Sequence, residues 1–108
     1  RAELDALSSA ENETLASVVS LWEISIKQSN GKLRLPAPAA QWLPNELAKA
    51  RIETLDIGRN HALTAGALPT YHRDPFDRML VAQAIAEGLT LVTRNPAMKR
   101  YDVQTFEG

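Results

Sequence analysis

The spacing of hydrophobic positions along the chain predicts alternating helices and strands. The clearest helical pattern covers residues 74–87, where apolar residues recur at intervals of three and four and Gly88 supplies a C-terminal stop. The clearest strand pattern is Leu89–Thr93, a nearly apolar run typical of a strand buried on both faces. A helix, a tight glycine turn and a buried strand form the unit from which parallel sheets are built.

Weaker patterns extend this alternation to the rest of the chain. Ser20 and Glu23 have the spacing of a capping box, and Asn30-Gly31 ends the helix that follows. The alternation favours an α/β fold with a mostly parallel sheet, in a single domain over residues 1–108. The remaining expected elements are a helix at 1–9, strands at 14–19, 52–57 and 103–106, and helices at 21–28, 39–50, 60–68 and 95–100.

Composition narrows the function classes. The chain has 108 residues, which is the size of one globular domain, and no apolar run is long enough for a membrane span. It contains no cysteine, which excludes thiolate zinc sites and cysteine nucleophiles. Residues 1–13 show no signal peptide, so we expect a cytoplasmic protein with no membrane contact. The net charge of -1 gives no global field, so contact with nucleic acid depends on local patches.

Two carboxylates stand among apolar residues. Glu23 shares one side of its expected helix with Val19 and Ile26, and Asp77 heads an apolar stripe that continues through Leu80 and Val81. A buried ionised carboxylate needs a cation, backbone donors or a metal. The alternative is a capping role: Glu23 in the capping box, and Asp74-Pro75-Phe76-Asp77 as an ordinary capped helix start.

The expected sheet edge suggests what these acids do. Ligands bind beyond the carboxyl ends of parallel strands, which places Thr93-Arg94-Asn95 at a candidate active edge. Carboxylates held there suit a hard divalent cation such as Mg²⁺ or Mn²⁺, the usual machinery of phosphoryl transfer. Basic residues collect nearby and either hold a phosphate backbone or form a solvated face: Arg73, Arg78, Arg94, Lys99 and Arg100.

Other chemistries find less support. His61 and His72 lack zinc-binding spacing, so we interpret each as a surface or capping histidine. Trp22 and Trp42 are interpreted as core or interface residues. There is no nucleophile elbow, phosphate-binding loop or dinucleotide fingerprint.

Four segments in fixed order resemble one family over essentially the whole chain. They are SLWEISIK at 20–27, GKLRLP at 31–36, HRDPFDRML at 72–80 and LTLVTRN at 89–95. Together they resemble the PIN-domain ribonucleases, and most closely the VapC-type toxins of type II toxin–antitoxin pairs. The resemblance implies a three-layer α/β/α domain, metal-dependent cleavage of RNA, inhibition of translation, and a VapB-like antitoxin that blocks the site.

The resemblance also assigns residues. Glu23 and Asp77 match the family's second and third acids, which implies that they are catalytic and hold Mg²⁺ or Mn²⁺. Asn95 falls where a fourth acid often stands and is a weaker, neutral oxygen ligand, which Asp74 supplements. Arg94, with Arg73 and Arg78, would position the RNA backbone.

The chain departs from the family pattern at its start. Family members begin with a hydrophobic strand that ends in Asp, and this sequence shows no such segment. We therefore expect the first strand and its catalytic Asp to be missing from this chain. A homodimer, a swapped element or a separate N-terminal segment would then fill the gap in the sheet. The alternative function is a catalytically incomplete module that only engages an antitoxin or itself.

Overall fold

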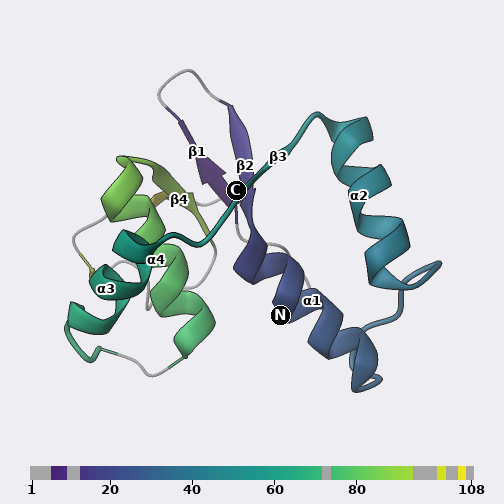
Figure 1. Cartoon of the computed structure of the whole chain (residues 1–108), viewed down its shortest axis with the longest axis horizontal. Coiled ribbons are helices and arrows are strands. Elements are labelled where there is room, and N and C mark those ends of the chain that lie inside the picture. Colours follow the sequence, from purple (N-terminus) through teal and green to yellow (C-terminus); the bar gives the residue numbers. More distant parts are fainter. Residues whose placement is uncertain (1–5, 10–12, 72–73, 94–99, 102–104, 107–108) are drawn as a thin grey trace.

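A five-stranded sheet flanked by helices forms the body of the molecule (Figure 1). The structure, a computed structural model, describes residues 6–9, 13–71, 74–93, 100–101 and 105–106. Helices and strands alternate along most of the chain, which confirms the predicted α/β class. The elements are β1 (Ala6–Ser8), β2 (Thr14–Ser17), α1 (Val18–Ser29), α2 (Ala39–Ala50), β3 (Glu53–Leu55), α3 (Arg59–Ala67), α4 (Pro75–Glu87), β4 (Thr90–Val92) and β5 (Thr105–Phe106).

The sheet has the strand order β3-β2-β1-β4-β5 and is mixed. The two outer pairs, β2 with β3 and β4 with β5, are parallel as predicted, whereas β1 runs antiparallel to both β2 and β4. Leu7 of β1 lies opposite Leu15 on one side and Leu91 on the other. The central position of the sheet, which we expected this chain to leave empty, is therefore occupied by β1.

The helix predicted over residues 1–9 is wrong for the part that the structure describes. Residues 6–8 are strand, and Leu7 is fully buried in the core. Pairing on both edges satisfies the backbone of this short segment, and such tertiary contacts outweigh a weak local preference for helix. The expected helical turn at 95–100 lies almost wholly outside the described residues.

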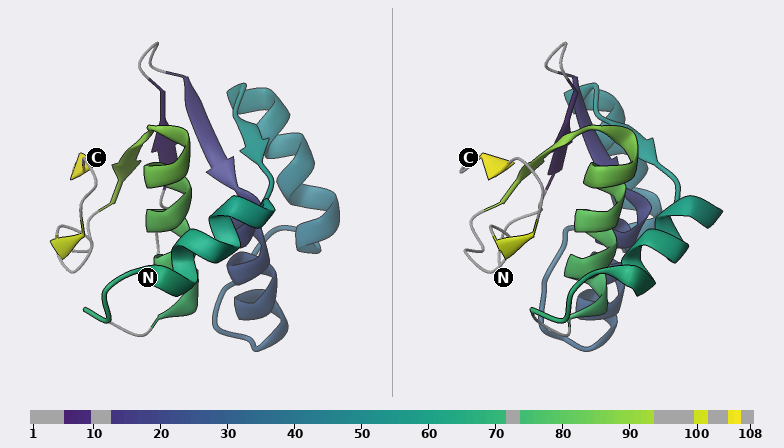
Figure 2. Two further views of the ribbon diagram at one scale, coloured as in Figure 1. Left: turned by 60° about the vertical axis from the view of Figure 1, so that its left-hand side comes forward. Right: turned by 90° about the vertical axis from the view of Figure 1, so that its left-hand side faces the viewer.

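The helices lie on both sides of the sheet. In Figures 1 and 2, α3 and α4 stand on one side, while α2 stands on the other beside β3. The boundaries of α2 agree with the prediction, and α4 agrees to within one residue. Gly88 ends α4 with φ at +66°, a left-handed conformation that glycine adopts without steric cost.

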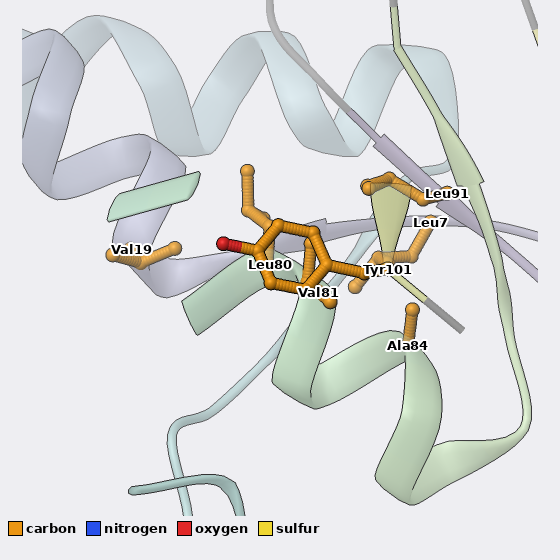
Figure 3. Close-up of a cluster of buried hydrophobic side chains, with 7 residues drawn as sticks. All are labelled: Leu7, Val19, Leu80, Val81, Ala84, Leu91 and Tyr101. Atoms are coloured by element: carbon orange, nitrogen blue, oxygen red, sulfur yellow. The ribbon is translucent and has the colours of Figure 1, made fainter. Parts of the chain in front are cut away.

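One hydrophobic cluster fixes α4 and the start of α1 against the centre of the sheet (Figure 3). It joins Leu7 of β1 and Leu91 of β4 to the buried face of α4, and Val19 brings in the first turn of α1. Because α1 and α4 share one core, the residues one turn away from this cluster on the two helices are held in fixed relative positions. The buried members are Leu7, Val19, Leu80, Val81, Ala84, Leu91 and Tyr101.

Within the described part of the chain, no helix combines the length and apolar character needed to cross a membrane.

Candidate active site

The first candidate carboxylate lies on α1, which continues directly from β2. The buried Oγ of Ser17 caps this helix by accepting a hydrogen bond from the Val19 backbone N–H at 3.1 Å. The predicted cap at Ser20 is therefore wrong, because the helix begins three residues earlier than the pattern indicated. Glu23 falls in the second turn, too far along the helix to complete a capping box. A capping role for Glu23 is thus excluded.

Glu23 is largely withdrawn from water and already faces one cation. Its side chain is 12% exposed, and Oε2 lies 3.3 Å from the Lys27 ammonium nitrogen one turn further on. One turn before Glu23, on the same side of the helix, Ser20 is buried, and its Oγ has no hydrogen-bond partner among the described residues. This stretch of α1 therefore presents a carboxylate and an unsatisfied hydroxyl, both hard oxygen donors.

The second candidate carboxylate lies in the first turn of α4. Asp74 is the N-cap: its Oδ1 accepts hydrogen bonds from the backbone N–H groups of Phe76 at 2.9 Å and Asp77 at 3.3 Å. Pro75 occupies the first helical position, so the predicted capped start is confirmed. Asp77 follows at the third position and is 3% exposed, near the positive end of the helix dipole. Oδ2 of Asp74 takes no part in these capping hydrogen bonds. A ligand role for Asp74 stays a prediction.

The two acid-bearing helices meet beside the acids. The ring of Trp22, next to Glu23, packs edge-to-face on the ring of Phe76, next to Asp77, with 5.1 Å between the centroids. Val19 lies one turn before Glu23 on α1. It belongs to the same core cluster as Leu80 and Val81, which lie one turn after Asp77 on α4. The side of α1 that carries Glu23 and the side of α4 that carries Asp77 therefore both turn toward this helix–helix contact.

Three predicted site residues fall outside the described part of the chain. They are Arg73, Arg94 and Asn95, so the structure places neither the expected fourth ligand nor these two cations. Among the described residues, no group of three or more histidine, aspartate or glutamate side chains gathers to hold a metal. The candidate site is therefore based on Glu23 and Asp77, and a metal there would need water or further oxygen ligands to complete its shell.

Arg78 has a different place from the one expected. Its guanidinium donates to the carbonyl oxygens of Ala65 at 2.8 Å, Leu68 at 3.2 Å and Pro69 at 3.0 Å. These carbonyls lie at the end of α3 and just beyond it, where helical carbonyls have no partners in their own helix. Arg78 therefore ties α3 to the first turns of α4, and its predicted contact with RNA stays a prediction.

Sequence reasoning missed a polar network between α3 and α4. His61 is 5% exposed, and its Nδ1 accepts a hydrogen bond from the Gly58 backbone N–H at 2.9 Å, which confirms the capping role. The ring proton then resides on Nε2, which lies 2.8 Å from Oε2 of Glu87. The sequence did carry one signal: Gln83 and Glu87 are four residues apart and therefore share one face of α4. In the structure, both side chains contact His61.

The comparisons with known proteins agree with this architecture. The family model of the PIN domain matches residues 1–104. Ribonuclease VapC22 of Mycobacterium tuberculosis (strain ATCC 25618 / H37Rv) is 31% identical over 91 residues, which cover 83% of this chain and 68% of that protein. The family match covers β1 to β4 and the two helices that carry Glu23 and Asp77. The chain therefore belongs to the PIN-domain family, among its VapC-type ribonucleases.

Proposed function

We propose that this chain is an endoribonuclease that depends on Mg²⁺ or Mn²⁺ held by Glu23 and Asp77. The observation that carries the proposal is the placement of these two acids. Each is largely or fully withdrawn from water, and the sides of α1 and α4 that bear them turn toward one contact. Similarity to a ribonuclease supports RNA as the substrate.

The donor set suits such an ion. Mg²⁺ takes oxygen ligands in an octahedral shell and commonly binds one or two carboxylates while keeping several waters. Glu23 and Asp77 supply the carboxylates, and the unsatisfied Oγ of Ser20 offers a further oxygen on the same side of α1. Asn95 and Oδ2 of Asp74 remain predicted additions. A divalent ion bound here would activate water and offset the charge that develops on the phosphate.

The chain's own side chains perform the remaining tasks. The Trp22–Phe76 contact holds the two acid-bearing helices in a fixed orientation. Burial of Asp77 keeps bulk water away from its carboxylate, which strengthens its attraction for a cation. Arg94 and Arg73 are proposed to hold the RNA backbone, since arginine pairs with phosphate oxygens through two parallel hydrogen bonds.

The proposed cellular role is that of a toxin in a type II toxin–antitoxin pair. Its resemblance to VapC-type toxins supports cleavage of cytoplasmic RNA, inhibition of translation and capture by a VapB-like antitoxin. Trp22 is 58% exposed although it packs on Phe76, and it offers such a partner an apolar contact beside Glu23. Association as a homodimer belongs to the same proposal.

Cleavage of labelled RNA by the purified chain tests the proposal. We expect cleavage with Mg²⁺ or Mn²⁺ and none in EDTA. Asp77→Asn should lower the rate by at least roughly 100-fold, because it removes the charge and keeps the shape. Glu53→Gln, a matched change at an exposed acid on β3, should leave the rate unchanged. Full activity of Asp77→Asn, or cleavage in EDTA, would overturn the proposal.

A binding module is the second candidate. It is favoured by one observation: the neutral Asn95 stands where the resemblance places a fourth acid. A chain that binds an antitoxin or a second copy of itself, yet cleaves no RNA with either metal, would support this alternative.

A further inference from the structure

A tyrosine that precedes α4 in the sequence contacts an arginine that follows β4. The guanidinium carbon of Arg100 lies 4.8 Å from the centre of the Tyr71 ring. Tyr71 in turn makes an edge-to-face contact with Tyr101, with 5.0 Å between the ring centroids. Tyr101 is 4% exposed and belongs to the core cluster, so the stack is anchored in the interior at one end. Its other end is the exposed Arg100.

The segment before Tyr71 is tied to the helix that carries Asp77. Arg78, the residue after Asp77, holds the carbonyls of Leu68 and Pro69. Three residues beyond Tyr71, Asp74 begins α4 as its N-cap. An extended chain of three residues spans at most about 11 Å, and Asp77 follows within one helical turn. Tyr101, at the buried end of the stack, also shares the core cluster with Leu80 and Val81, which lie one turn beyond Asp77 on α4. The proposed metal site does not require the stack for its function.

The position of Arg100 over the Tyr71 ring is compatible with free hydrogen-bond donors on its guanidinium. A guanidinium lying over a ring uses its face for the contact, while its N–H donors lie in its plane and point outward. No carboxylate in the described part of the chain pairs with Arg100. The ring also restricts the arginine's rotamers, so binding an anion costs less side-chain entropy than at a free surface arginine. These features fit an oxyanion that accepts two parallel hydrogen bonds.

We propose that Arg100, supported by Tyr71, is an anchoring subsite for a phosphate of the RNA strand next to the cleavage site. This inference rests on the proposed ribonuclease function and adds a substrate contact that neither the acids nor Arg94 supplies. Tyr71 is 41% exposed, so its ring is also accessible to an unstacked base beside that phosphate. Tyr71 acts as a positioning residue, and Arg100 is the group that touches RNA.

Fluorescence anisotropy with short single-stranded oligouridylate and oligoadenylate tests the subsite. The experiment is run in EDTA, so that no cleavage occurs and binding is measured independently of the metal. Arg100→Gln should weaken RNA binding about five- to tenfold and reduce the salt-dependence slope by about 0.7, the value for one phosphate contact on a single strand. Arg100→Lys keeps the charge without the fork and should lie between Arg100→Gln and the unaltered chain.

Two further variants separate the ring from the charge. Tyr71→Leu should weaken RNA binding severalfold, because the arginine loses its platform. Tyr71→Phe keeps the ring and should bind RNA as the unaltered chain does. Arg34→Gln removes the same charge from an exposed arginine in the loop between α1 and α2 and should change affinity less than twofold.

The outcomes distinguish the two proposals. Equal losses for Arg100→Gln and Arg34→Gln would overturn the subsite and leave the ribonuclease function standing. The same holds if all Arg100 and Tyr71 variants bind RNA as the unaltered chain does, which would assign the stack to the fold or to a protein partner. If the unaltered chain binds neither oligonucleotide in EDTA, the subsite is overturned, and the ribonuclease function is decided separately by the cleavage assay with Mg²⁺ or Mn²⁺. Thermal melting of each variant checks that a loss of binding is not a loss of folding.

Discussion

At the residue scale, the proposed site combines an acid and a competing cation on the same helix. Lys27 lies one turn beyond Glu23, and its ammonium nitrogen is 3.3 Å from Oε2. A surface pair of this spacing contributes little to stability. The Glu23 carboxylate, however, is only 12% exposed, so the pairing is screened less than at the surface. A divalent ion that binds Glu23 through this oxygen must displace the lysine.

Replacing Lys27 should therefore tighten metal binding. We expect Lys27→Met to raise Mn²⁺ affinity by roughly three- to tenfold, since one competing charge is removed near the ligand. Isothermal titration calorimetry measures the change. Lys49→Met is the matched control, because Lys49 pairs with Glu46 at 3.2 Å on the exposed surface of α2. Weaker Mn²⁺ binding by Lys27→Met would instead show that the lysine holds Glu23 in its binding orientation.

At the element scale, local signals identified most helices and strands but not their pairing. Asp74, Pro75 and Gly88 mark both ends of α4 by their own backbone preferences, so the sequence pattern located this helix well. By contrast, Ala6–Ser8 is a strand because it has neighbours on both sides and buries Leu7. Such pairing depends on residues far along the chain, which a local pattern does not contain.

The same limit applies to the candidate site. The pattern placed Glu23 and Asp77 on the inner faces of their helices, and both are withdrawn from water. It misplaced the helix start at Ser20, because β2 ends at Ser17 and that serine caps α1. The stack of Arg100 on Tyr71 could not be predicted, since it joins the chain before α4 to residues after β4.

The junction of α3 and α4 yields a stability prediction. We expect His61→Ala to lower the free energy of unfolding by about 2 kcal/mol, because it leaves a cavity at a buried position and removes the hydrogen bond from the Gly58 backbone N–H. Glu87→Ala should cost less than about 1 kcal/mol, because the Glu87 side chain is 45% exposed and water replaces the lost contact. Urea unfolding followed by circular dichroism compares the two. Equal losses would contradict this division between a buried and an exposed partner.

At the scale of the whole molecule, recognition of RNA has to come from local placement of charge. The net charge of -1 provides no attraction for a polyanion at long range. A metal at Glu23 and Asp77 would bring positive charge to the proposed site, and Arg100, held over the Tyr71 ring, adds a further cation. Substrate binding should accordingly depend on a few contacts, with a shallow dependence on salt.

The central claim is that Glu23 of α1 and Asp77 of α4 hold one divalent ion together. Titration of the unaltered chain, Glu23→Gln and Asp77→Asn with Mn²⁺, followed by the electron paramagnetic resonance of free Mn²⁺, tests it most directly. The account predicts one specific site in the unaltered chain and a loss of at least roughly tenfold in affinity in each variant, with circular dichroism unchanged. Mn²⁺ binding of equal strength in all three proteins would contradict the account.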